Sequence, residues 1–226
     1  MSEINTESVQ QLFDAGVHIG YSKARRHPSA QNFIHTTKTR GDIINIEETD
    51  RQIIEAEEFL KELTAGGKQV LLVGTKPEAS AIIKNMADKL DLPYVQNRWI
   101  GGTLTNASEI DVRIKRLRTL LDQQEKGELI YQTKKEKLML EREIDRLKIK
   151  FGGLLNMTGK PAALIIVDSL SEDIAITEAQ KTGVPTVSIS NTDCDLKKVT
   201  YPIIANDAAR SAIQLIINRL GEALKK

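Results

Sequence analysis

The sequence has little cysteine, few aromatic residues and no long apolar run. Its single cysteine among 226 residues, Cys194, excludes an internal disulfide and a zinc site built from paired cysteines. A reducing compartment is therefore expected. No apolar stretch approaches the roughly 20 residues needed to cross a bilayer, and the acidic, polar start at Met1–Glu7 is unlike a signal peptide. These absences predict a cytoplasmic protein, and aromatics at 4% predict an aliphatic core.

Net charge is also nearly absent, because the 32 Lys and Arg residues are almost balanced by 31 Asp and Glu residues, which gives a formal charge of +1. This balance excludes a uniformly basic tail and an acidic disordered chain. It arises by cancellation, however. Residues 16–41 hold five basic residues and no acidic one, whereas residues 42–96 hold six basic and eleven acidic residues. Residues 109–150 hold twelve basic and nine acidic residues.

Residues 16–41, here called the basic segment, also contain all three histidines and the aromatic residues Tyr21 and Phe33. Basic side chains neutralise phosphates, and flat side chains stack on exposed bases, so this composition is typical of an RNA-binding or phosphate-binding segment. The alternative is a solvated loop that lacks acids. On charge alone, the candidate contacts are Arg26, His27, Lys38 and Arg40.

Most of the chain alternates between buried strands and amphipathic helices. Short apolar runs predict strands at 68–74, 92–95, 162–167, 184–189 and 201–204, with a further short strand at 43–46. Apolar residues at helical spacing predict helices at 47–63, 77–90, 172–181 and from Asn206 or Asp207 to about Ala223. This alternation predicts a parallel sheet with helices on both faces.

Residues 107–151 interrupt this pattern, because they lack a clear strand signal. Two sets of apolar residues step by 4, 3 and 4 positions: Ile110, Ile114, Leu117 and Leu121, then Leu140, Ile144, Leu147 and Phe151. Thr133 and Glu136 have the spacing of a capping box at the start of the second helix. We predict a protruding helical hairpin at 107–150, inserted into an α/β core of residues 1–106 and 151–226.

Three features invite a catalytic or ligand-binding interpretation. Gly74-Thr75-Lys76 lies between a strand and a helix but lacks the spacing of a P-loop. Gly101-Gly102 could bind an anion through its amides, although a tight turn is the simpler interpretation. Asp168, Asp193 and Asp195 follow strand ends, where α/β sheets bind ligands. None of these residues forms a catalytic set with assigned roles, so an α/β enzyme acting on a phosphate ligand stays an alternative, and neither metal nor cofactor is expected.

Several motifs, in order, resemble the bacterial small-subunit ribosomal protein S-two family. They are Ala15-Gly16-Val17-His18-Ile19-Gly20, Val73-Gly74-Thr75-Lys76 and the specific decapeptide Asn97–Asn106, followed by Pro161 with Ala162–Asp168, Glu178-Ala179, Gly183-Val184-Pro185, Asp193-Cys194-Asp195, Tyr201-Pro202-Ile203 and Asn206-Asp207-Ala208. The resemblance covers nearly the whole chain. The chain departs from the family pattern at Tyr21, Arg26-His27, Ala30, Leu196 and Ala205.

The resemblance implies a flavodoxin-like, three-layer α/β/α fold with a five-stranded parallel sheet and a protruding coiled-coil hairpin. It implies a structural, non-catalytic role in the small ribosomal subunit, bound to small-subunit rRNA and to neighbouring ribosomal proteins, including protein S-one. It adds His18, Lys23, Arg25 and Arg98 as RNA-binding residues. The base of the hairpin is expected to face rRNA as well, which adds Arg113, Lys115 and Arg116. A protein–protein adaptor that docks through the hairpin is a further alternative.

Overall fold

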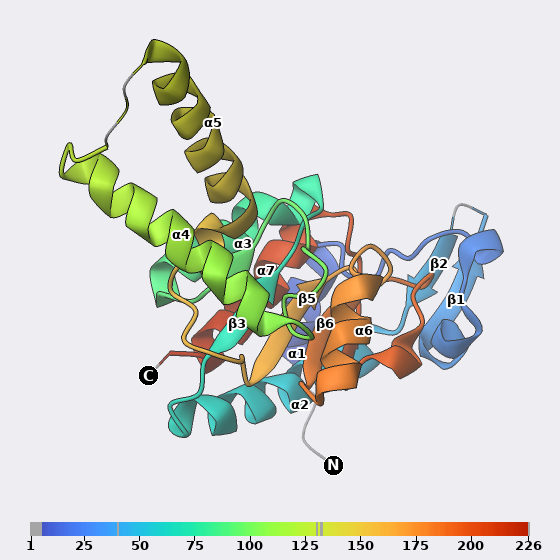
Figure 1. The fold of residues 1–226 in the computed structure, drawn as a ribbon. Coiled ribbons are helices and arrows are strands. Elements are labelled where there is room, and N and C mark those ends of the chain that lie inside the picture. Colours follow the sequence, from blue (N-terminus) through green and yellow to red (C-terminus); the bar gives the residue numbers. More distant parts are fainter. Residues whose placement is uncertain (1–5, 40, 130, 132, 226) are drawn as a thin grey trace.

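The computed structural model describes residues 6–39, 41–129, 131 and 133–225 (Figure 1). Its centre is a parallel five-stranded sheet in the order β4-β3-β5-β6-β7. The strands are β3 (Val70–Val73), β4 (Tyr94–Val95), β5 (Ala163–Val167), β6 (Thr186–Ser190) and β7 (Tyr201–Ile204). Counted from β3, this is the flavodoxin-like order 2-1-3-4-5. The predicted fold class and the five predicted core strands are confirmed.

Helices cover both faces of the sheet, which gives three layers (Figure 1). One layer consists of α1 (Thr6–Asp14), α2 (Ile46–Ala65), α3 (Pro77–Leu90) and α7 (Arg210–Ala223). The other contains α6 (Asp173–Thr182) and the inner parts of α4 (Ala107–Glu125) and α5 (Lys134–Phe151). Side chains of β3 alternate between the layers: Val70 and Leu72 pack against the first, and Leu71 and Val73 against the second.

The helix ends follow largely from local sequence signals. Pro77 occupies the first turn of α3, and Gly183 ends α6 in the left-handed conformation at φ 68°. The predicted cap of the last helix was wrong, because α7 begins at Arg210. The Asn206 side chain instead accepts hydrogen bonds from the amides of Ala208 and Ala209, so it stabilises the turn before the helix.

Helices α4 and α5 lie between β4 and β5 in the sequence and extend away from the sheet in Figure 1. The two helices contact each other, each buries apolar residues such as Ile114 on α4 and Ile144 on α5, and Arg116 Nε lies 3.3 Å from Glu143 Oε1. The capping box of Thr133 and Glu136 is confirmed. The division of the chain into a core and an inserted unit at 107–150 stays a prediction. In the part of the chain that the structure describes, no helix has the length and apolarity to cross a membrane.

The basic segment forms a small unit beside the main sheet. Together with residues 42–44, it forms two 3-10 turns, Lys23–Arg25 and Pro28–Phe33, and a two-stranded antiparallel sheet of β1 (Ile34–Lys38) and β2 (Gly41–Ile44). A separate apolar cluster of Ala30, Ile44, Cys194, Leu196 and Ile204 joins this unit to the end of the main sheet. The sequence pattern predicts a strand near β2, whereas β1 and α1 were not predicted.

Candidate nucleic-acid interface

The loops that follow the parallel strands meet at the carboxyl edge of the sheet, next to the basic segment. Gly74-Thr75-Lys76 follows β3, Asp168 follows β5, residues 191–195 follow β6 and Asn206-Asp207 follow β7. Strands β3 and β5 are neighbours at the point where the strand order reverses. Open α/β sheets bind their ligands at this point, so it is the first place to look for a site.

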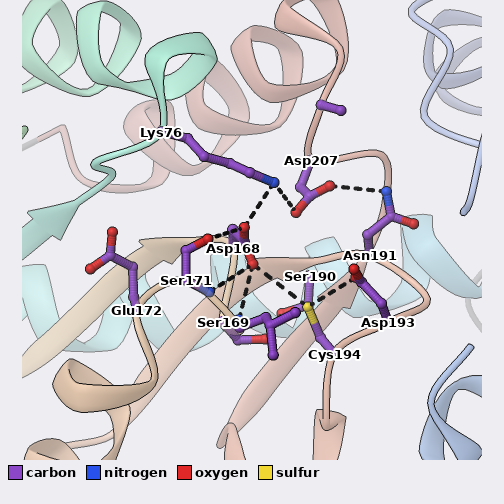
Figure 2. Close-up of polar contacts among 12 residues, drawn as sticks. Lys76, Asp168, Ser169, Ser171, Glu172, Ser190, Asn191, Asp193, Cys194 and Asp207 are labelled. Atoms are coloured by element: carbon purple, nitrogen blue, oxygen red, sulfur yellow. Dashed lines mark hydrogen bonds and ion pairs between the residues drawn. The ribbon is translucent and has the colours of Figure 1, made fainter. Parts of the chain in front are cut away.

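Three charged side chains occupy this position (Figure 2). Lys76 Nζ lies 2.8 Å from Asp168 Oδ2 and 2.7 Å from Asp207 Oδ2. Burial works to lower the pKa of Lys76, but the two carboxylates raise it well above its ordinary value. Burial opposes ionisation of Asp168 as well, yet hydrogen bonds from Lys76 and Ser171 hold its pKa below the usual range. The charge of Lys76 is therefore satisfied within the protein.

The neighbouring groups are also engaged within the chain. The hydroxyl of Thr75 donates to Glu172 Oε1 at 2.5 Å, and burial raises the pKa of Glu172. Burial raises the pKa of the Cys194 thiol to about 12, with added repulsion from nearby carboxylates. This thiol is a poor nucleophile at neutral pH. The residues that resemble a phosphate loop thus bind side chains of their own chain instead of presenting groups to a ligand.

The glycine turn at Gly101-Gly102 does bind an anion, but the anion is a side chain of the protein itself. The Glu178 carboxylate accepts hydrogen bonds from the amides of Gly102 at 2.7 Å, Leu104 at 3.0 Å and Thr105 at 3.2 Å, and from the Trp99 indole at 3.3 Å. Burial works to raise the pKa of Glu178, and these donors lower it below its ordinary value. The interaction joins the decapeptide to α6.

The basic segment is held against the loop after β6. Thr192 makes two of these bonds: its carbonyl accepts from the His27 amide at 2.8 Å, and its hydroxyl accepts from the Tyr21 amide at 3.1 Å. Ser29 Oγ donates to the Cys194 carbonyl at 3.3 Å and accepts from the Leu196 amide at 3.0 Å. These bonds fix the backbone, so they do not depend on which side chains stand at positions 21 and 27.

The predicted contacts of the basic segment differ in how available they are. Lys23 and Lys38 are exposed and form no ion pair within the described ranges. Arg25 is 59% exposed, stacks on the Tyr21 ring at 4.3 Å and reaches Asp193 at 3.1 Å. Arg26 differs: its guanidinium donates to both carboxylate oxygens of buried Asp42, at 2.7 and 2.5 Å.

Two histidines are the remaining predicted RNA contacts of the basic segment that the structure describes. His18 stacks on Phe13 with ring centroids 4.4 Å apart, and burial together with the charge of Lys38 lowers its pKa. A neutral imidazole is therefore favoured for His18 at neutral pH. The His27 side chain is 38% exposed, and its Nδ1 lies 2.8 Å from Ser29 Oγ. Arg40 lies outside the described residues.

The remaining predicted contacts lie on α4 and beside it. Arg113 is exposed and without an ion pair in the described part of the chain, whereas Lys115 pairs with Asp111 at 2.6 Å and Arg116 with Glu143. Arg98 is exposed and lines a small cavity at the end of α5, together with Lys148 and Lys150. These two lysines were not predicted as RNA contacts, because nothing in their local sequence pattern places them near Arg98.

Comparison with known proteins agrees with this fold. The family model described as ribosomal protein S2 matches residues 12–226. The small ribosomal subunit protein uS2 of Corynebacterium urealyticum is 40% identical over 223 residues, which covers 97% of this chain and 82% of the relative. Its namesake from Corynebacterium jeikeium is 41% identical over 220 residues, covering 96% of this chain and 79% of the relative.

The likeness extends beyond one genus. The protein uS2 of a Picosynechococcus strain is 39% identical over 217 residues, covering 96% of this chain and 85% of the relative. These proteins form a structural family and not a family of enzymes, so the alternative of an enzyme acting on a phosphate ligand is wrong. The family model covers nearly the whole chain and the relatives are about 40% identical over almost all of it, so the chain belongs to the ribosomal protein S2 family.

Proposed function

We propose that the chain is a structural component of the small ribosomal subunit that binds small-subunit rRNA and neighbouring ribosomal proteins. Membership of the S2 family supports the place in the small subunit. One observation supports the RNA contact most strongly: the basic segment presents exposed cations from a rigidly held loop. We propose a location in the cytoplasm, on the ribosome, and no cofactor.

The proposed RNA contacts fall into two groups. The first consists of exposed cations that would neutralise phosphates: Lys23, Arg25, Lys38, Arg98 and Arg113. Arg40, which lies outside the described residues, is proposed as a phosphate contact on its charge alone. The second group would contact RNA at shorter range or would support RNA binding indirectly. It contains His18, Arg26, His27, Lys115 and Arg116. For Arg26 we propose an indirect role, because its two bonds to Asp42 hold the loop that carries Lys23 and Arg25. A loop held in its bound shape loses less entropy when it binds.

The protein neighbours form the other part of the proposal. Contact with ribosomal protein S-one is inferred from the family resemblance. Exposed apolar side chains such as Val112, Met139 and Ile149 on α4 and α5 are available for protein neighbours. An adaptor that docked through these helices would lose its partners when residues 109–150 are deleted, yet it would keep its full RNA affinity.

Sedimentation tests the assignment. We expect the purified chain to co-sediment with small subunits that lack it, in a sucrose gradient at low salt, and to dissociate as salt rises. A Lys23/Arg25/Lys38→Ala variant should dissociate at lower salt than the wild type, because three phosphate contacts are lost. A Lys84→Ala variant, which removes one exposed cation from α3, should behave like the wild type. A wild-type chain that stays at the top of the gradient at every salt concentration would contradict the proposal.

A further inference from the structure

A continuous series of hydrogen bonds joins the filled crevice to the basic segment. Lys76 Nζ lies 2.7 Å from Asp207 Oδ2, and Asp207 Oδ1 accepts from Asn191 Nδ2 at 3.0 Å (Figure 2). The other end of the same amide, Asn191 Oδ1, accepts from the Thr192 backbone amide at 2.7 Å. Each of these residues is buried or nearly so, which keeps water from competing for the bonds.

The series ends at the loop that carries two exposed cations. Thr192 binds the amides of Tyr21 and His27, and these residues flank Lys23 and Arg25. Thr192 is also tightly seated, because a Cβ added at Gly20 would lie 2.7 Å from its Cγ2. A shift of Thr192 would therefore move both ends of the loop between residues 21 and 27.

We propose that Lys76 is a positioning residue for RNA binding: it holds Asp207 and Asn191 so that Thr192 fixes the cation-bearing loop. This inference rests on the proposed binding of rRNA. The Lys76 side chain is 21% exposed and bonded to two carboxylates, so its action on the loop is indirect. Without it, Asp168 and Asp207 would repel each other across the crevice, and Asn191 would lose its fixed partner.

The test compares Lys76→Met with Lys84→Met in the full-length chain. Lys84 lies on α3, the helix that begins directly after Lys76, and is exposed, so its replacement removes the same charge without touching the series. In Lys76→Met we expect the amides of Tyr21 and His27 to exchange with solvent at least about 10-fold faster, while amides in α5 keep their rates. We expect affinity for small-subunit rRNA to fall about 3- to 10-fold with an unchanged salt slope, because no phosphate contact is lost.

Two outcomes would overturn the proposal. A salt slope shallower by about one would mean that Lys76 itself contacts a phosphate. Wild-type affinity in a folded but less stable Lys76→Met protein would mean that the crevice contributes to stability alone. If this variant does not fold, Asn191→Ala leaves the ion cluster in place and breaks the series at the next step, with the same expected result. Failure of the proposed function is distinguishable, because the wild type would then not bind rRNA at all.

Discussion

The basic segment and helices α4 and α5 are both rich in cations, but their cations find carboxylates in different ways. In the segment, the partners come from other parts of the chain: Asp42 binds Arg26, and Asp193, 168 positions away, binds Arg25. On α4, Lys115 pairs with Asp111 one turn earlier, and both side chains are more than half exposed. The first arrangement holds a loop in place, whereas the second mainly lowers local charge.

Because of this difference, the number of basic residues in a region is not the number that can contact RNA phosphates. Nine acidic residues accompany the twelve basic ones in residues 109–150, so an RNA strand would meet a mixed surface there. The segment has no acid of its own, and its exposed cations Lys23 and Lys38 remain without an ion pair within the described residues. We therefore expect the segment to contribute more phosphate contacts than α4.

The largest expected effect concerns the thiol of Cys194, which lies beneath the basic segment. At its pKa of about 12, the thiolate fraction near pH 8 should be about 1,000-fold smaller than in the unfolded chain, which slows its reaction with a disulfide reagent. Arg26→Met should loosen the segment and raise this rate at least about 10-fold. The matched change Arg116→Met should leave the rate unaltered. Equal rates in the two variants, followed with a chromogenic thiol reagent, would remove the contrast between the two regions.

The next effect concerns the attachment of α5 to the sheet. A Cβ at Gly153 would lie 2.2 Å from the Tyr94 carbonyl oxygen, so Gly153→Ala must displace backbone. We expect a loss of about 1–3 kcal/mol in the free energy of unfolding, measured by urea denaturation. Gly152→Ala is the control, because its Cβ meets nothing within 4 Å and its backbone is helical. That variant should be as stable as the wild type or more stable by up to about 1 kcal/mol. Similar losses in both variants would contradict the close contact.

A smaller effect is expected from pH, through His18. Burial and Lys38 lower its folded-state pKa below 6.5, so the unfolded chain takes up a proton first as pH falls. The contribution of His18 to stability is therefore complete above pH 6.5 and is lost between this value and the lower folded-state pKa. Chemical denaturation at pH 7.5 and pH 5.5 of the wild type and His18→Gln checks this. A wild type that loses no more stability than the variant on acidification would contradict the assignment.

The smallest effect is expected for the surface pair on α4. Asp111→Ala removes the partner of Lys115, and exposed pairs one turn apart contribute about 0.3–0.5 kcal/mol. Thermal denaturation should show a change of no more than about 1–2 °C. A larger loss would mean that the α4 pairs are structural in the way that the Arg26–Asp42 pair is.

The sequence predicted the parts of the fold that depend on local apolar periodicity and on residues that start or end helices. The strand at β3, the helix from Pro77 to Leu90 and the capping box at Thr133 all follow from patterns within a few residues. Strand β1 was missed because its five residues are mostly exposed and polar, so they carry no apolar signal. Helix α1 is short and buries one residue among those described, Leu12, which explains the same failure there.

The candidate site was less predictable, because its partners are far apart in the sequence. Lys76 and Asp168 were each singled out from the sequence, but their ion pair spans 92 positions and needs the strand order to bring them together. At Gly101-Gly102 a tight turn was preferred over anion binding, because the anion, Glu178, lies far away in the sequence on α6. Lys38 followed from charge alone and Lys23 and Arg25 from the family resemblance, whereas the pairing of Arg26 with buried Asp42 was not predicted.

The salt dependence of rRNA binding tests the contrast between the two regions most directly. Lys23/Arg25/Lys38→Ala and Arg113/Lys115/Arg116→Ala each remove three cations, and both can be titrated against the same small-subunit rRNA fragment. The slope of log K against log salt should become shallower by about 2 to 3 in the first variant and by no more than about 1 in the second. Equal changes in slope, or a larger change in the second variant, would contradict the account.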